Sequence, residues 1–328
     1  MNKPKTVAIT GAGGFIGSHL VENLVIKGWK VKALVHYNSR NNWGNLERIN
    51  GDILDDAEIV FGDILDPGFM KTFLKGVDVV FHLAALISIP FSYQAPLLYF
   101  RVNVEGTINV LQACLENSVE KIVVTSTSEV YGTAQYTPID EAHPLQAQSP
   151  YSASKIGAEK SAQSYYCAFD LPVAVIRLFN TFGPRQSSRA IIPTIITQAL
   201  VGNEIKLGNT TPVRDMTYVL DAVDGFIKIA ECDESVGEVI NIGCGIGYSI
   251  KEIVEVVGIV LDKEFRIIKD EKRMRPEKSE VLKLVCSNRK AFQLLQWIPN
   301  YYFQRELRLT IESIQEDLDL YKPGRYNI

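Results

Sequence analysis

Short β-branched runs alternate with helix-length amphipathic segments through the first half of this 328-residue chain. This alternation is typical of βαβ units, in which helices cover both faces of a parallel sheet. We therefore predict an α/β fold built on a doubly wound parallel sheet. Its strands are expected at Thr6–Thr10, Lys30–Val35, Glu58–Phe61, Val77–His82, Lys121–Ser126 and Val173–Leu178.

The regular alternation weakens beyond Asn180, where turn-forming pairs such as Gly183-Pro184 separate shorter and more charged segments. We therefore predict a first domain over residues 1–180 and a smaller α/β domain over residues 181–328. Val239–Ile242 is a short β-branched run followed by Gly243. A strand near residues 239–243 is expected to return to the first sheet.

Composition excludes several classes of partner. The formal net charge is −4, so nothing indicates a polyanion-binding surface, and no nucleic acid partner is expected. No apolar run approaches the roughly 20 residues of a spanning helix, and the chain starts without the apolar segment of a secretion signal. We expect a cytoplasmic protein with no membrane partner. The five scattered cysteines fit no zinc spacing, and no metal is expected.

A glycine-rich loop, Thr10–Gly17, joins the first predicted strand to the first predicted helix. Glycine permits a tight turn, a close approach to a pyrophosphate and close helix–sheet packing, so that the first helical amides face the anion. In this strand–loop–helix context the loop predicts a Rossmann-like dinucleotide-binding domain, with a structural turn as the alternative. The loop residues expected to contact the dinucleotide are Gly11, Gly14, Phe15, Ile16 and Gly17.

The adenosine end of the predicted site is less usual. The run after the second strand lacks the acid that binds the ribose hydroxyls in an NAD-specific site. His36 and Arg40 are available to face a 2′-phosphate, so the cofactor is NAD or NADP, with a solvated loop as the alternative for Arg40. Asp63 is expected to bind the adenine amino group, unless it caps the next helix. The residues expected to line the rest of the groove are Ile64, Leu83, Ala84 and Ala85.

Tyr151 and Lys155 are four residues apart, which puts them on one face of a helix. The run Thr127-Ser128-Glu129 ends a strand and lies within reach of the same substrate. A tyrosine base at neutral pH needs its pKa lowered by roughly three units, and one nearby charge gives about one to three. Oxidation alone needs no carboxylate, whereas breaking a further bond does. The pattern therefore predicts oxidation coupled to elimination.

Several segments together resemble the extended short-chain dehydrogenase/reductase family, and the resemblance covers nearly the whole chain. They are Gly11–Gly17, His82–Ala85, Asn103 in its Val-Asn-Val-Glu-Gly-Thr run, Thr127–Gly132, the Tyr151/Lys155 pair, Asn180–Arg185, Arg214-Asp215 and Arg275-Pro276. Within the family, Ser149–Lys155 resembles sugar-nucleotide 4,6-dehydratases. Tyr37–Gly44 and Arg273–Val281 are most similar to dehydratases of bacterial legionaminic-acid-type pathways.

The resemblance implies a mechanism. Tyr151 removes the C4 hydroxyl proton while hydride passes to the cofactor, and Glu129 takes the C5 proton. The C6 hydroxyl leaves as water and the hydride returns to C6, giving a 4-keto-6-deoxy sugar nucleotide and a tightly held NAD or NADP. Asn103, with Tyr151 and Lys155, would contact the cofactor. The residues implied for the nucleotide sugar are Asn180, Arg185, Arg214 and Arg275, of which Arg214 and Arg275 have the better matching contexts.

Ser128 departs from the Asp-Glu pair of dTDP-glucose dehydratases. Thr-Ser-Glu also occurs in GDP-mannose dehydratases, where the Glu can do both jobs, and in UDP-glucuronate decarboxylases, so this segment does not separate dehydration from decarboxylation. The context of Tyr151 and the late Arg-Pro run favour dehydration. A decarboxylase, a C4 epimerase in which Glu129 only hydrogen-bonds, and a dinucleotide-binding sensor without turnover remain as alternatives.

Two long helices are expected near Ala95–Glu116 and Pro150–Ala168. The family resemblance implies that they pair across a two-fold axis, which would make the protein a homodimer. Packing of the same helices within one chain is the alternative, and composition does not choose between them.

Overall fold

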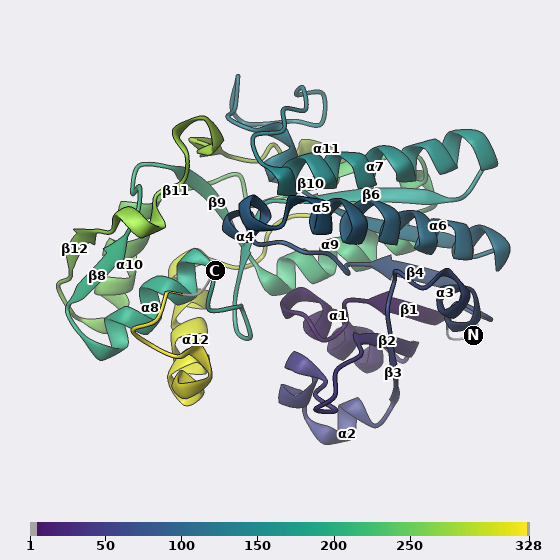
Figure 1. Ribbon diagram of the computed structural model, residues 1–328, viewed down its shortest axis with the longest axis horizontal. Coiled ribbons are helices and arrows are strands. Elements are labelled where there is room, and N and C mark those ends of the chain that lie inside the picture. The colour runs from purple at the N-terminus through teal and green to yellow at the C-terminus, as the bar shows by residue number, and fades with distance from the viewer. Residues whose placement is uncertain (1–4, 327–328) are drawn as a thin grey trace.

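The computed structural model describes residues 5–326, and within them a seven-stranded parallel sheet has the order β10-β6-β5-β4-β1-β2-β3 (Figure 1). The strand order reverses between β1 and β4, and a crevice opens at the carboxyl ends of the strands at such a point. The strands are β1 (Thr6–Thr10), β2 (Lys30–His36), β3 (Ala57–Gly62), β4 (Val79–His82), β5 (Lys121–Thr127), β6 (Val173–Leu178) and β10 (Val239–Ile242).

The predicted doubly wound α/β class is confirmed, and so are the six predicted strands. Thr6–Thr10 and Val173–Leu178 agree with the structure at both ends, and the largest difference is at β4, which begins two residues after Val77. Val239–Ile242 forms β10 and pairs in parallel with β6 at the edge of the sheet. The division of the chain into two domains stays a prediction.

Helices cover both faces of the sheet, as Figure 1 shows. One face packs against α1 (Phe15–Ile26), α9 (Val219–Glu231) and α11 (Arg289–Leu295), the other against α3 (Pro67–Phe73), α6 (Gly106–Glu116) and α7 (Pro150–Phe169). Val7 and Ile9 of β1 face the first set of helices and Ala8 faces the second. Because both faces are buried, the strands read as continuous apolar runs. The short α2 (Gly51–Leu54) packs beside α1.

The helix expected over Ala95–Glu116 is interrupted, so that prediction was wrong as a single α-helix. After α4 (Ile89–Gln94), α5 (Pro96–Phe100) joins α6 through a π-helical turn at Arg101–Glu105. Asn103 lies in this turn, and its carbonyl accepts a hydrogen bond from Thr107 Oγ1 at 2.6 Å. Side chains that bond to the helical backbone are a known cause of such irregularities.

The second helix was predicted correctly, since α7 spans Pro150–Phe169. Among residues 5–326, no helix combines the length and apolar character that crossing a bilayer requires.

The remaining elements lie beside the carboxyl ends of the sheet strands (Figure 1). One small sheet contains β7 (Asn180–Phe182), β9 (Val213–Tyr218), β11 (Gly247–Ser249) and β13 (Lys283–Leu284), and another pairs β8 (Glu204–Leu207) with β12 (Arg266–Lys269). They pack with α8 (Ile191–Val201), α10 (Ile250–Leu261) and α12 (Phe303–Glu316) around a separate apolar core. Since β7 follows β6 almost directly, this part of the molecule is positioned over the crevice.

A buried ion pair fixes α7 on the sheet. Arg177 of β6 donates from Nε to Glu159 Oε2 at 3.0 Å, and Glu159 is fully buried. Ser126 of β5 donates to the same carboxylate at 2.8 Å, and Arg177 Nη1 donates to the Tyr131 hydroxyl at 2.7 Å. Glu159 is one turn beyond Lys155, so the pair holds the active-site end of α7 against β5 and β6.

Replacing Glu159 with Gln would leave the Arg177 guanidinium buried without a counter-charge. We expect Glu159→Gln to lower the free energy of unfolding by about 3 to 5 kcal/mol, measured by urea denaturation. Glu120→Gln removes an exposed partner of Lys5 and serves as control, with an expected change within about 0.5 kcal/mol. Equal, small effects of both variants would contradict this assignment.

Candidate active site

The glycine loop is shaped for a bound diphosphate. Gly11 has φ +72°, and a Cβ there would lie 2.8 Å from the Ala84 amide nitrogen, while a Cβ on Gly17 would lie 2.3 Å from the Gly11 carbonyl oxygen. Gly14 caps α1 without a side-chain hydrogen bond, and the first turn carries no acid. Because the first amides of a helix lack intrahelical acceptors, those of Phe15 and its neighbours can bind an anion. These residues fit a dinucleotide pyrophosphate.

The segment after β4 is tied to this loop. Thr10 Oγ1 accepts hydrogen bonds from the amides of Leu83 (3.2 Å) and Ala84 (3.1 Å), and it lies 2.8 Å from His82 Nδ1. His82 Nε2 lies 2.9 Å from Thr107 Oγ1. Burial lowers the pKa of His82 to about 3, so the ring is neutral at pH 7. The predicted groove residues Leu83 to Ala85 therefore lie beside the glycine loop.

At the adenosine end, His36 Nε2 lies 3.3 Å from Asp63 Oδ2, and both side chains are partly exposed. Asp63 accepts from the amide of Leu65, whereas Asp66 is the residue that caps α3. The helix-cap alternative for Asp63 is therefore excluded. Within residues 5–326 the exposed Arg40 side chain makes no hydrogen bond or ion pair. The Ile64 side chain is buried among the apolar side chains that pack α3 and α6 against the sheet.

The expected catalytic residues meet where β5 and α7 approach each other. Thr127 ends β5, and the 3₁₀ turn Ser128–Tyr131 follows it directly. A Ser149/Ser152 capping box starts α7 and places Tyr151 in the first helical turn. Ser128, Glu129, Tyr151 and Lys155 are all buried. The local chain chemistry thus brings Thr127, Glu129 and Tyr151 together, with Lys155 one helical turn beyond Tyr151 and Ser128 in the turn between Thr127 and Glu129.

The protonation of this cluster differs from the expectation. Burial raises the pKa of Tyr151, a hydrogen bond with Thr127 opposes the rise, and the Glu129 charge adds to it. Lys155 Nζ donates to the carbonyl of Thr125 at 2.6 Å, and burial lowers the pKa of Lys155 to about 8. Lys155 is thus held by the backbone of β5.

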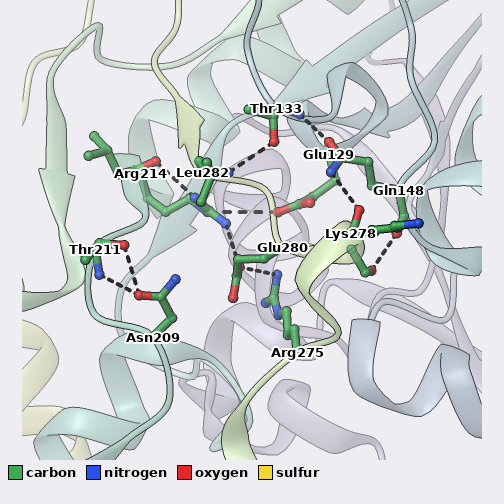
Figure 2. Close-up of polar contacts among 12 residues, drawn as sticks. Glu129, Thr133, Gln148, Asn209, Thr211, Arg214, Arg275, Lys278, Glu280 and Leu282 are labelled. Atoms are coloured by element: carbon green, nitrogen blue, oxygen red, sulfur yellow. Dashed lines mark hydrogen bonds and ion pairs between the residues drawn. The ribbon is translucent and has the colours of Figure 1, made fainter.

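Figure 2 shows Arg214 beside Glu129, and Arg275 on the far side of Glu280. Arg214 Nε is 4.0 Å from Glu129 Oε1, and Arg214 Nη2 is 3.9 Å from Glu280 Oε1. Arg275 Nη1 is 3.6 Å from the same Glu280 oxygen. Arg214 is almost fully buried, and burial lowers the pKa of its guanidinium. Asn180 begins β7, which pairs with β9, and its Oδ1 is buried without a hydrogen-bond donor among the described residues.

Two predicted site residues have other partners. Arg185 donates from Nη2 to Glu22 of α1 at 2.6 Å, so it joins α1 to the segment after β7 rather than facing the pair Arg214 and Arg275. Asn103 was expected to contact the cofactor. Its Nδ2 donates to the Leu86 carbonyl and to Ser154 Oγ, and its Oδ1 accepts from the Leu86 amide. Protein groups occupy the carboxamide of Asn103, and the roles expected for Arg185 and Asn103 stay predictions.

Sequence reasoning did not assign two residues at the site. Glu280 lies within the Arg273–Val281 segment, and its position five residues after Arg275 is the signal in the sequence that could have assigned it to the site. Tyr93 bonds to Ser279 at 2.7 Å across 186 residues of chain, and no local pattern predicts such a contact.

A family model described as GDP-mannose 4,6 dehydratase matches residues 8–310. The chain belongs to that family, within the extended short-chain dehydrogenases/reductases that the fold and the Tyr151/Lys155 pair define.

Similar proteins carry three different activities. The chain is 31% identical over 317 residues to a putative UDP-glucose 4-epimerase of Methanocaldococcus jannaschii, covering 95% of this chain and 99% of the relative. It is 32% identical over 324 residues to a UDP-N-acetyl-alpha-D-glucosaminuronate decarboxylase of Bacillus cytotoxicus, covering 95% and 98%. Among solved structures, the dTDP-glucose 4,6-dehydratase DesIV of Streptomyces venezuelae, solved with NAD, gives a TM-score of 0.88 at 28% identity, covering 98% and 100%.

The low pKa of Lys155 predicts a stability effect with a defined pH dependence. The unfolded chain, with a lysine pKa of 10.5, binds this proton more tightly than the folded protein, where the pKa is about 8, so stability rises with pH between these values. Lys155→Met removes the cost of burying the charge. We expect its free energy of unfolding to exceed that of the parent by roughly 1 to 3 kcal/mol at pH 7, and the difference to shrink as the pH approaches 10.5.

Chemical denaturation at both pH values measures this difference. Lys160→Met, which changes an exposed lysine on the same helix, controls for simple loss of a charge. A Lys155→Met protein that is less stable than the parent at both pH values would refute the prediction.

Proposed function

We propose that this protein is a nucleotide-sugar 4,6-dehydratase, a lyase that converts a nucleoside-diphosphate hexose or N-acetylhexosamine to its 4-keto-6-deoxy product. The observation that carries the proposal is the buried Glu129 carboxylate beside Tyr151, with Arg214 behind it. Hydride transfer alone does not need this carboxylate, whereas removal of the C5 proton does.

The proposed reaction gives a role to each of the predicted catalytic residues. Tyr151 takes the C4 hydroxyl proton, which requires the positive nicotinamide ring of the bound dinucleotide to lower the pKa that burial raises. Thr127, at the end of β5, orients that hydroxyl. Glu129 takes the C5 proton, made acidic by the new C4 ketone, and then protonates the leaving C6 hydroxyl. When the hydride returns to C6, C5 regains a proton, which balances the proton that Tyr151 took from the C4 hydroxyl. Ser128 stands where the dTDP-glucose enzymes have an aspartate, so Glu129 performs both proton transfers. Lys155 holds α7 on β5 through Thr125 and contributes positive charge near the site.

The cofactor we propose is NAD, held at the glycine loop. When bound, the dinucleotide accepts the C4 hydride and returns it to C6. The solved relative DesIV contains NAD, which supports this choice. Since the hydride returns within each turnover, the dinucleotide stays bound through the cycle.

A decarboxylase or C4 epimerase is the second candidate, because one relative of each kind matches nearly the whole chain. The three reactions differ in product mass, since dehydration loses water, decarboxylation loses carbon dioxide and epimerisation leaves the mass unchanged. Mass spectrometry of products from candidate nucleotide sugars therefore separates them, and the same preparations give the mass of the bound dinucleotide.

Glu129→Gln replaces the proposed proton acceptor with a group of the same shape that cannot take a proton. We expect formation of the dehydrated product to fall by about 100-fold or more, since general acid–base groups contribute on that order. Glu255→Gln, at an exposed ion pair with Lys251, is the control and should leave the rate unchanged. Parent-level dehydration by Glu129→Gln would remove Glu129 from the mechanism.

We also propose that the protein is a homodimer formed through the layer of α5, α6 and α7. These helices pack beside one another on one face of the sheet (Figure 1). Leu97 is 79% exposed, and Phe100 and Ile108 on the same helical run are also exposed. A second copy would cover these apolar side chains.

Leu97→Asp places a charge in the proposed interface. The parent should sediment with twice the chain mass of 36.6 kDa, whereas Leu97→Asp should shift toward the monomer. Leu320→Asp changes another exposed leucine away from these helices and should sediment like the parent. A parent that is monomeric at all concentrations tested would rule out the dimer.

A further inference from the structure

Residues 275–282, called the strap here, cross the mouth of the site and are tied to the residues that precede the catalytic helix. Gln148 Nε2 donates to the Lys278 carbonyl at 3.1 Å, as Figure 2 shows. Ser279 Oγ donates to the Gln148 carbonyl, and the Tyr93 hydroxyl lies 2.7 Å from the same Oγ. These contacts place the strap residue Glu280 at a defined position facing the arginines.

The contacts of the Glu280 carboxylate with Arg214 and Arg275 are ion pairs without hydrogen bonds. The separations of 3.9 Å and 3.6 Å from one carboxylate oxygen both exceed hydrogen-bond length. Among the described residues, the only side-chain hydrogen bond of Arg214 runs to the Val213 carbonyl, and the buried Arg275 Nη1 has no acceptor. The two guanidiniums therefore keep unused donors.

Two guanidiniums this close repel each other, and the Arg275 charge is one of the causes that lower the pKa of Arg214. Glu280 and Glu129 supply the opposing charges, so the formal charges of the four groups cancel. A guanidinium fork suits phosphate oxygens, and its hydrogen bonds to them are shorter than the carboxylate separations seen here. A diphosphate arriving at these donors would meet the Glu280 carboxylate at close range.

We propose that Glu280 is a built-in substitute anion for the substrate diphosphate: it holds Arg214 and Arg275 in place before substrate binds, and the diphosphate displaces it. This inference rests on the proposed function, in which these two arginines bind the diphosphate of a nucleotide sugar. Glu280 then acts as a positioning residue that lowers the affinity for the nucleotide and speeds its release. It takes no part in the proton transfers of Glu129 and Tyr151.

Glu280 is expected to stabilise the protein without ligand and to weaken its binding of a diphosphate. Because these two effects can be measured separately, the inference can be tested. A purely structural role predicts that its loss weakens both folding and nucleotide binding. The competitor role predicts that its loss weakens the free protein but strengthens diphosphate binding, because the charge opposing the ligand is gone.

The test measures binding of UDP, dTDP, GDP and CDP to the purified protein with its dinucleotide, by titration calorimetry, for the parent, Glu280→Gln and Glu277→Gln. Glu277 is exposed on the same strap, so its variant removes an equal charge at a matched place. We expect Glu280→Gln to bind the preferred diphosphate about tenfold tighter or more, and Glu277→Gln to stay within about twofold of the parent. Without diphosphate, the melting temperature of Glu280→Gln should be lower than that of the parent.

Equal or weaker diphosphate binding by Glu280→Gln overturns the inference, and so does a failure of all four diphosphates to bind both parent and variant. Loss of water from nucleotide sugars is assayed separately on the parent. If the parent shows no dehydratase activity but Glu280→Gln binds the diphosphate more tightly, the proposed reaction is wrong and the role of Glu280 is still supported.

Discussion

A line of buried hydrogen bonds joins the glycine loop to the catalytic helix. It runs from Thr10 through His82 and Thr107 to Asn103, whose carboxamide reaches Ser154 on α7. Each of these groups is buried, so each needs its partner, because an unpaired polar group inside a protein costs free energy. The neutral state of His82 follows from the same burial. The line sets the distance between the place for a dinucleotide and the face that carries Tyr151.

The other side of the site depends on charge. Glu129, Arg214, Glu280 and Arg275 follow one another at 3.6 to 4.0 Å, without hydrogen bonds between them. These buried charges depend on one another, because removing one leaves another without its counter-charge, whereas the line from Thr10 to Ser154 depends on hydrogen bonds. The two sides of the cleft are therefore held by different kinds of interaction.

Features fixed by neighbours in sequence could be predicted, and those fixed by distant contacts could not. The β-branched runs gave the strands, and the glycine spacing gave the loop whose backbone approach leaves no room for a Cβ at Gly17. The bonds of the Asn103 carboxamide could not be predicted, because its partners Leu86 and Ser154 lie 17 and 51 residues away. The ion pair of Arg185 could not be predicted either, since its partner Glu22 lies 163 residues earlier. A sequence motif gives the residue types at a site, but it does not show which distant residue each side chain contacts.

The path of the chain between its two parts has a consequence for how such enzymes diversify. After building β7, α8 and β9 over the crevice, the chain returns through α9 to cover one face of the first sheet and through β10 to form its edge. In a hybrid of two relatives with a single crossover near residue 180, the first sheet would come from one protein, whereas α9 and β10, which cover one of its faces and form its edge, would come from the other. Exchange of the elements over the crevice between relatives therefore needs a junction near residue 180, one on each side of the segment that holds α9 and β10, and one on each side of α11, which covers the same face of the first sheet.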